Sequence, residues 1–326
     1  MKAFGRRMFF WGLLIASPLC VCAQGGGARR GMDFFSFLIQ PKFVAMLLIG
    51  LVVWFLLVFR RMVRSVKVVL LLLSTMMFGF LGNIPGEIFS SFAMHPSPMC
   101  AATKPLLYGF GIPFLVTVAV IFFLTLVGPK LFCGWICPVG AIQELIAMVA
   151  DKTGIRRLRF SFRLAFIVRL GLFLAFIFLS ATAILHTTIQ GRVFALSFYD
   201  HINAFHGLEF QLESSFFDTL LHYLPFLLTV ILAFRYYRPF CHFVCPMGLL
   251  AHWLEQAAVY RIRLRKSDCT DCRLCVAKSP CTAVHDILQI TELRPDCYAC
   301  NVCVESCADG ALDFGVKRVV DGKARN

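Results

Sequence analysis

Five long apolar stretches constrain the fold of this chain more than any other feature of its sequence. They cover residues 43–59, 68–84, 106–128, 164–185 and 216–234. A bilayer core is crossed by about 20 predominantly apolar helical residues, with a range of about 17–25, and every stretch meets that length. Pro225 in the fifth stretch is tolerated, because neighbouring groups in a membrane protein satisfy the freed carbonyl. The sequence therefore predicts an α-helical polytopic membrane protein with about five transmembrane helices.

The composition supports a membrane protein and argues against a nucleic-acid-binding protein. Of the 326 residues, 59% are hydrophobic and 15% are charged, and the mean hydropathy is +0.77. The net charge of +14 would suit nucleic acid only if it covered a soluble basic face. The basic residues instead crowd beside the apolar stretches, as they do on the cytoplasmic side of membrane proteins. We therefore expect this chain to contact a lipid bilayer and no nucleic acid.

The basic residues also predict an orientation. They form three clusters after the first, third and fifth stretches, namely Arg60, Arg61, Arg64 and Lys67, then Lys152, Arg156, Arg157, Arg159 and Arg163, then Arg235 and Arg238. Segments 85–105 and 186–215 contain one basic residue each. The positive-inside rule then places these two segments in the periplasm and the chain after residue 234 in the cytoplasm of a bacterial cell, around a multi-pass inner-membrane protein. We expect Arg169, near the cytoplasmic end of the fourth stretch, to extend its side chain to the membrane surface.

The last part of the chain contains eight cysteines in two short runs. Each run begins with Cys-x₂-Cys-x₂-Cys and has a later fourth cysteine: Cys269, Cys272, Cys275 and Cys281, then Cys297, Cys300, Cys303 and Cys307. Three thiolates at this spacing let one loop bind three corners of a [4Fe–4S] cluster, whereas zinc ribbons use pairs of cysteines separated by a longer gap. The runs resemble those of bacterial two-cluster ferredoxins, although the gap before Cys281 is longer. The resemblance implies one cluster on Cys269, Cys272, Cys275 and Cys307 and a second on Cys297, Cys300, Cys303 and Cys281.

A Cys-x₃-Cys-Pro motif occurs twice in the chain, at residues 133–138 and 241–246. Each copy follows an apolar stretch and precedes an apolar-rich helical pattern, so residues 128–150 and 236–258 form a parallel internal repeat. Proline favours the first turn of a helix, which predicts that Cys137 and Cys245 lie at helix N-termini. The four cysteines, Cys133, Cys137, Cys241 and Cys245, are enough for one further metal or redox centre. Structural thiols and reversible disulfides within each pair are the alternatives.

The combination of two Cys-x₃-Cys-Pro copies after transmembrane helices with a C-terminal two-cluster run resembles the NapH/NosR polyferredoxin family, over about residues 43–315. The resemblance implies an electron-transfer subunit that connects the membrane quinone pool with another redox protein or iron–sulfur subunit, as NapH-type quinol dehydrogenase subunits do. The alternative is a NosR- or CcoG-like factor that supplies electrons for the maturation of a metalloenzyme. A long periplasmic flavin-binding domain of the NosR type is absent from the sequence, which favours the NapH-like interpretation.

These features divide the chain into four predicted parts. They are a signal peptide or uncleaved N-terminal helix at 1–23, a transmembrane domain at 43–258, a small α+β ferredoxin-like domain at 259–316 and a disordered tail at 317–326. Alternating residues at 260–265 predict a short strand at the start of the third part. His201 and His206 lie in a predicted periplasmic segment, where either could accept a proton from a quinol. A helix lying on the membrane surface is the simpler interpretation of that segment.

Overall fold

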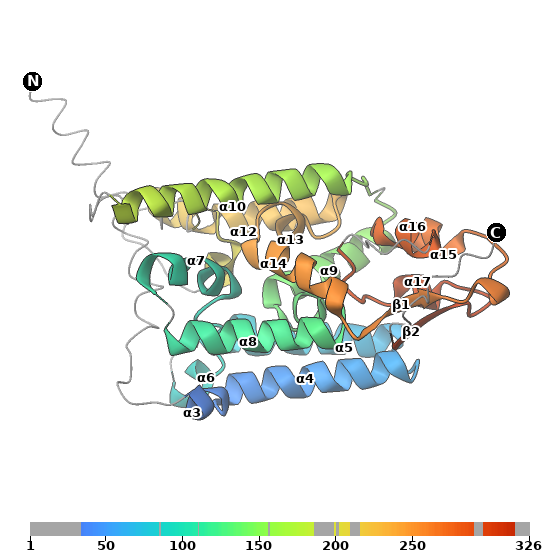
Figure 1. Ribbon diagram of the computed structural model, residues 1–326, viewed down its shortest axis with the longest axis horizontal. Helices are drawn as coiled ribbons and strands as arrows, with labels where there is room; N and C mark the ends of the chain where they lie inside the picture. Colours follow the sequence, from blue (N-terminus) through green and yellow to red (C-terminus); the bar gives the residue numbers. More distant parts are fainter. Residues whose placement is uncertain are drawn as a thin grey trace, which may run out of the picture.

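The computed structural model describes residues 34–84, 86–109, 111–155, 157–185, 199, 202–208, 216–289 and 296–316. The predicted signal peptide and the predicted tail lie outside these residues. Long helices lie side by side in the molecule, and the two strands and the last short helices gather at one end of the bundle (Figure 1). We call this end the domain end and the opposite end the far end.

Among the residues that the structure describes, three helical segments are long and apolar enough to cross a membrane. They are α4 (Pro41–Val58), the run Arg64–Asn83, and the first 20 residues of α10 (Phe162–Leu185). The run Arg64–Asn83 is built from α5 (Arg64–Ser74), the π-helix η1 (Thr75–Phe80) and the 3₁₀ turn η2 (Leu81–Asn83). These segments correspond to the first, second and fourth predicted stretches.

The third and fifth predicted stretches form helices with shorter described apolar parts. Helix α8 (Ile112–Val127) has 16 residues, and the apolar part of α12 (Phe216–Arg235) begins at Thr219. The third stretch was expected to begin at residue 106, but residues 106–108 belong to a separate helix, α7 (Pro98–Tyr108). Gly109 ends α7 at a φ of 85°, which glycine adopts without steric cost. The structure supports a helical membrane protein, and five full spans remain a prediction.

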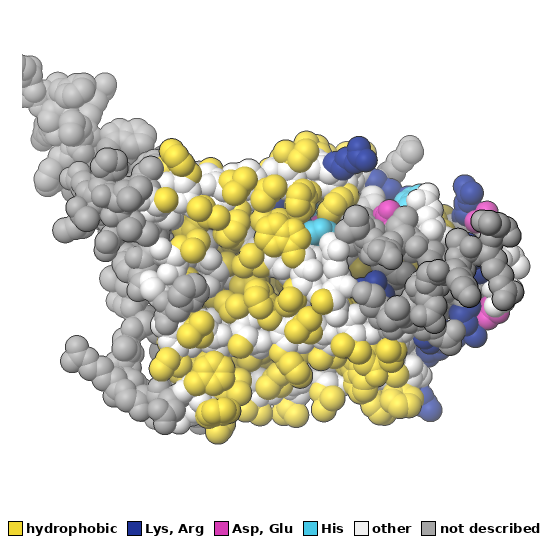
Figure 2. Space-filling view, viewed as in Figure 1, with side chains coloured by type: hydrophobic (Ala, Val, Ile, Leu, Met, Phe, Trp, Pro, Cys, Tyr) yellow, Lys and Arg dark blue, Asp and Glu magenta, His cyan; other side chains and the backbone are white. Residues whose placement is uncertain are grey.

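The surface of the bundle is largely apolar. Hydrophobic side chains cover the helices, and Lys and Arg side chains gather mainly toward the domain end (Figure 2). Ile167 and Phe178 on α10 and Ile231 on α12 are 65%, 68% and 63% exposed. A broad apolar surface of this kind is unfavourable in water and marks contact with a membrane or another protein.

Shorter elements complete the described chain. The helices among them are α3 (Phe34–Leu38), α6 (Glu87–Ser90), η3 (Phe132–Ile136), α9 (Pro138–Lys152), η4 (Ala204–Leu208), α13 (Pro239–Phe243), α14 (Pro246–Leu254), η5 (Glu255–Ala257), η6 (Lys266–Asp268), α15 (Leu274–Lys278), α16 (Ala283–Leu288) and α17 (Val302–Glu305). Strand β1 (Tyr260–Leu264) pairs antiparallel with β2 (Leu312–Val316), and the buried Ile262 lies opposite the buried Phe314. The predicted strand is confirmed, and the sheet joins the start of the cysteine-rich segment to its end.

The segment between α10 and α12 folds back into the bundle at η4. Gly207 packs against Phe226, which lies ten residues into α12, or about 15 Å along that helix. The side-chain amide of Asn83 donates to the carbonyl of Leu208 at 2.7 Å. Irregular backbone at such depth in a membrane protein is stable only where protein covers it, and four of the five η4 residues are buried. This part of the predicted periplasmic segment is therefore inside the protein.

Candidate iron–sulfur sites

The two Cys-x₃-Cys-Pro copies have the same local structure. The amide of Cys137 donates to the carbonyl of Phe132 at 2.9 Å, and the amide of Cys245 donates to the carbonyl of Phe240 at 3.0 Å. Each second cysteine is the N-cap of a helix whose first residue is the motif proline, in α9 and in α14. The prediction that Cys137 and Cys245 lie at helix N-termini is confirmed. Proline suits this position because its amide would have no helical partner there.

The fold brings the four motif cysteines together. The thiol of Cys133 interacts electrostatically with those of Cys241 and Cys245, and the thiol of Cys137 interacts with all three others. All four are buried. Burial is the main cause that raises the pKa of each thiol, so the thiolate form needs a metal or nearby cations. We call these four residues the repeat centre.

An arginine holds the first cysteine of each copy by its carbonyl group. Arg238 donates to the carbonyl of Cys133 at 2.7 Å, and Arg169 donates to the carbonyl of Cys241 at 2.9 Å. The expectation that Arg169 extends to the membrane surface is wrong, because this side chain is fully buried. Its guanidinium lies 3.3 Å from a carboxylate oxygen of Asp296, which compensates its charge inside the protein.

Glu144 anchors a buried ion network beside the repeat centre. Its carboxylate lies 2.6 Å from the ammonium of Lys67 and 3.0 Å from the guanidinium of Arg238, and it accepts a hydrogen bond from Tyr237 at 2.7 Å. Burial alone would raise the pKa of Glu144, but the charges of Lys67 and Arg238 and the hydrogen bonds from Lys67 and Tyr237 lower it to about 2. Glu144 is therefore ionised at any physiological pH.

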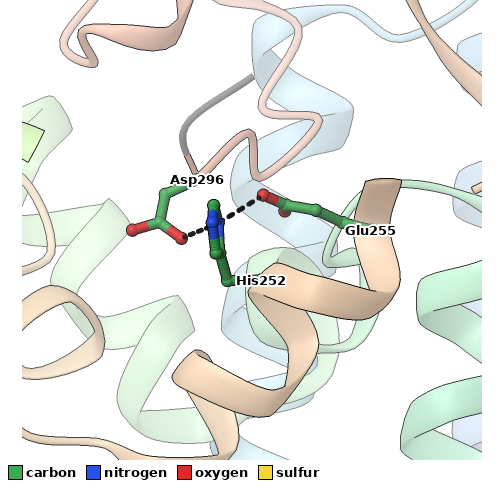
Figure 3. A group of neighbouring side chains, drawn as sticks. All are labelled: His252, Glu255 and Asp296. Atoms are coloured by element: carbon green, nitrogen blue, oxygen red, sulfur yellow. Dashed lines mark hydrogen bonds and ion pairs between the residues drawn. The ribbon is translucent and has the colours of Figure 1, made fainter. Parts of the chain in front are cut away.

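Asp296 anchors a second buried network. It forms an ion pair with Lys130, and the charges of Lys130 and Arg169 overcome its burial and hold its pKa well below the usual range. The imidazole of His252 lies between two carboxylates, 3.3 Å from Asp296 and 3.2 Å from Glu255 (Figure 3). These three residues have the spacing of a metal site. Because Lys130 and Arg169 already neutralise Asp296, we interpret the group as an ion network.

The structure also brings together both predicted ligand sets of the C-terminal segment. A hollow is lined by Cys269, Cys272, Cys275 and Cys307, the first set. In the second set, the thiol of Cys281 interacts with those of Cys297 and Cys300, and the thiol of Cys303 interacts with all three. We call the first set domain centre 1 and the second domain centre 2. Ligation of a cluster by either set remains a prediction.

The spacing of the thiols fits iron–sulfur clusters better than zinc. Four thiolates on one zinc ion, at about 2.3 Å each, lie only about 3.8 Å from one another. In the described chain, His252, Glu255 and Asp296 are the one group with three ligand atoms within 4.8 Å, so no three thiols lie that close. A [4Fe–4S] cluster separates its thiolates, because each binds a different iron atom. The thiol spacing among the described residues therefore argues against one zinc ion per set, and ligation of a cluster remains a prediction for all three sets.

Tyr298 lies between the repeat centre and domain centre 2. It follows Cys297 in sequence, is 2% exposed, and its phenol interacts electrostatically with the thiols of Cys133 and Cys241. Its ring lies 4.7 Å from the guanidinium carbon of Arg238. A Cβ atom at Gly134, the residue after Cys133, would lie 2.5 Å from the carbonyl oxygen of Tyr298, so only glycine allows this approach.

Sequence reasoning missed the buried ions and Tyr298, although the repeat contains a signal for some of them. Lys130 and Arg238 each precede the first cysteine of a copy by three residues, and both have positive φ values, 47° and 50°. Glu144 and His252 each follow that cysteine by eleven residues. An alignment of the two copies with each other would have selected these four positions. No such signal exists for Asp296 and Tyr298.

Comparisons with known proteins agree with this geometry. The model of the 4Fe-4S binding domain family matches residues 110–156 and 220–267, which contain the two Cys-x₃-Cys-Pro copies. The ferredoxin-type protein NapH of Haemophilus influenzae is 24% identical over 210 residues, which cover 61% of this chain and 66% of NapH. The putative electron transport protein YccM of Escherichia coli is 28% identical over 196 residues, covering 60% of this chain and 53% of YccM. The regulatory protein NosR of Pseudomonas aeruginosa is 26% identical over 190 residues, covering 56% of this chain and 24% of NosR.

The chain is similar to the NapH/NosR-type polyferredoxin family. No solved structure matches this chain. The alignments span about half of YccM and two thirds of NapH, so their complete activities are not transferred with the family. The comparisons and the apolar helices support a ferredoxin-type electron-transfer protein of a membrane, with iron–sulfur clusters.

Proposed function

We propose that this polyferredoxin carries electrons from a membrane quinol, through the repeat centre, domain centre 2 and domain centre 1, to a redox protein or iron–sulfur subunit. The observation that supports this most directly is the succession of the three four-thiol sets. Tyr298 joins the repeat centre to domain centre 2, and the thiol of Cys303 in domain centre 2 interacts with that of Cys275 in domain centre 1. Cys272 of domain centre 1 is exposed, where a partner can approach.

The buried charges suit anionic centres at the repeat centre and at domain centre 2. A [4Fe–4S] cluster held by four thiolates is negatively charged, and when bound it accepts or releases one electron at a time. The buried cations Lys130, Arg169 and Arg238 interact with thiols of the repeat centre, and the buried Lys67 donates to the carbonyl of Cys300 in domain centre 2. The buried carboxylates Glu144, Glu255 and Asp296 pair with these cations. The amide of Gln143 also lies 3.5 Å from the Cys241 sulfur. Cations and hydrogen bonds to sulfur stabilise the reduced state of such a centre.

Iron analysis of anaerobically purified protein tests the three centres. We expect about twelve iron atoms per chain, because each cubane contains four. Replacement of Cys133, Cys137, Cys241 and Cys245 by serine should remove about four of them. The matched control is Cys100→Ser, which changes a buried cysteine outside all three sets and should leave the iron content unchanged.

Two results would contradict the proposal. Equal iron in the fourfold variant and the wild type would remove the repeat centre from the electron path. Zinc in place of iron would remove all three centres. Reduction of the bound clusters by quinol then tests the donor: wild-type clusters that dithionite reduces and quinol does not would exclude a quinol donor.

A further inference from the structure

The described part of the segment between α10 and α12 packs against the repeat centre, on the side toward the far end. Tyr199 lies close enough to Cys245 for the two side chains to interact electrostatically. The ring of Phe205 lies 6.2 Å from that of Phe240, the neighbour of Cys241. A Cβ atom added to Gly79 would lie 3.6 Å from the side chain of Leu208 and 3.2 Å from that of Pro138, the residue after Cys137. The segment thus approaches three of the four cysteines.

Two histidines lie in or beside this segment. His206 of η4 is 3% exposed, and its Nε2 atom lies 3.5 Å from the side-chain nitrogen of Asn203. Its ring lies 4.7 Å from the ring of His222 on α12. His222 is half-buried and precedes Phe226, the residue that packs against Gly207, by one helical turn. The pair therefore runs from the surroundings of the repeat centre toward the far end.

Oxidation of a quinol needs bases as well as electron acceptors. Each molecule loses two protons and two electrons, and an iron–sulfur centre accepts electrons only. Histidine is suited to accept these protons, since its ordinary pKa is about 6.5. A route for protons toward the domain end would cross the buried ion networks, in which Lys130 and Arg169 are paired with Asp296 and Arg238 is paired with Glu144. The half-buried His222 on α12 lies in the opposite direction and offers an exit toward the far end.

We propose that His206 and His222 are the proton-accepting residues of a quinol site beneath the repeat centre, an inference that rests on the proposed function. His206 accepts a hydrogen bond from a quinol hydroxyl, takes its proton as the O–H bond breaks, and passes it to His222 and water at the far end. The second proton follows the same route. The two electrons leave one at a time toward the thiolate-bound centres, and quinone returns to the lipid. Leu220 and Leu224 on α12 are 44% and 40% exposed, so the isoprenoid tail can reach His222 from the membrane.

The test combines binding with kinetics in full-length protein reconstituted anaerobically in liposomes. A photoreactive azidoquinone should cross-link to residues in η4 or the first half of α12, and excess quinone should prevent the reaction. Quinol-dependent bleaching of the clusters should slow about 100-fold in His206→Gln, the loss typical of a missing general base. His222→Gln should slow about tenfold in the same assay. The matched control His285→Gln changes an exposed histidine of α16 and should behave as the wild type.

A merely structural role of His206 would not change the pH profile. The wild-type rate should rise with pH, because only neutral imidazole accepts a proton, and His206→Gln should lose this rise. Added imidazole should restore part of the rate. Dithionite should still reduce all clusters in both variants.

The outcomes separate this inference from the function on which it rests. If quinol fails to reduce the wild type while dithionite succeeds, the proposed function fails. If quinol reduces the wild type, His206→Gln and His222→Gln at equal rates, only the histidine assignment is overturned. Cross-linking confined to the domain end, or slow reduction of His206→Gln by dithionite as well, would also overturn it.

Discussion

Substitutions at Tyr298 test whether the ring or the hydroxyl of this side chain matters for packing and for electron transfer. Its ring contacts the cations of both repeat copies, whereas no hydrogen-bond partner for its hydroxyl lies among the described residues. We expect Tyr298→Phe to retain both stability and the rate of electron transfer between the repeat centre and domain centre 2. Tyr298→Ala should lower the free energy of unfolding by about 3–5 kcal/mol and slow that transfer, because it empties a buried volume between the two centres.

Rapid-mixing absorbance of the two cluster populations measures the transfer, and thermal unfolding measures stability. A Tyr298→Phe variant as slow as Tyr298→Ala would assign the role to the hydroxyl rather than to the ring. Equal rates in all three proteins would exclude Tyr298 from the electron path.

At the scale of residues, Arg169 is an example of a side chain whose contacts could not be predicted from the sequence. Its position in an apolar stretch predicts a side chain that extends to the surface, because that is the least costly placement for an isolated charge. Its actual partner, Asp296, follows it by 127 residues and belongs to the cysteine-rich segment. The local pattern of the fourth stretch contains no information about that contact. The first three cysteines of each C-terminal set, by contrast, were predictable from their short spacing, and the exchange of the fourth cysteine was implied by the resemblance to two-cluster ferredoxins. Ligation of clusters by these sets remains a prediction.

At the scale of elements, Glu144 joins α5, α9 and the segment that follows α12. Glu144→Gln preserves the shape of the side chain but leaves the buried cations Lys67 and Arg238 without their carboxylate. We expect a loss of about 3–5 kcal/mol in the free energy of unfolding, the range found when one member of a buried ion pair is removed. The matched control is Asp151→Asn, because Asp151 is the exposed partner of the ion pair with Arg157.

The pH dependence of that loss follows from the pKa of Glu144. A carboxyl group whose pKa is lower in the folded protein than in the unfolded chain contributes stability above its unfolded pKa. That contribution disappears only as the pH falls from about 4.5 toward about 2. The stability difference between wild type and Glu144→Gln should therefore be the same at pH 5.5 and pH 8. A difference that shrinks between these two values would show that Glu144 is not ionised by its buried cations.

Helix α9 provides a second test at the scale of elements, because it packs against its own motif through a glycine. A Cβ atom at Gly140 would collide with the carbonyl oxygen of Cys133. Gly140→Ala should destabilise the protein and release iron from the repeat centre, although alanine is favoured over glycine in helices by about 1 kcal/mol. Gly171→Ala on α10 is the matched control, since nothing lies within 4 Å of its added methyl group, and it should be neutral or stabilising. Equal behaviour of the two variants in thermal unfolding and iron content would contradict this packing.

The elements differ in how well the sequence predicts them. The Cys-Pro pairs predict the starts of α9 and α14 because a proline without an amide hydrogen suits the first helical turn. Alternation of apolar and basic residues predicts β1. The fold of η4 into the bundle was not predictable, because its burial depends on contacts with Asn83, Phe226 and Phe240, which lie far away in the chain.

At the scale of the whole molecule, the two ends of the bundle differ in their content of basic side chains. Lys and Arg side chains gather toward the domain end, whereas the long helices of the bundle present an apolar surface (Figure 2). The exposed basic residues at helix ends include Arg60, Arg64, Arg163 and Arg235. Since positive charges are retained on the cytoplasmic side during insertion, we expect the ferredoxin-like domain to lie in the cytoplasm of a bacterial cell.

Protease treatment of the two membrane orientations measures this topology. In inverted inner-membrane vesicles, the domain end faces the added protease, and cleavage should remove fragments that contain domain centre 1. In intact spheroplasts the same segment should be protected, while a periplasmic marker protein is digested as a control. The exposed loops around Cys272 and Arg273 offer the cleavage sites. Cleavage there in spheroplasts would reverse the orientation, place the proton exit of His206 and His222 on the cytoplasmic side, and require a redox partner outside the cytoplasm.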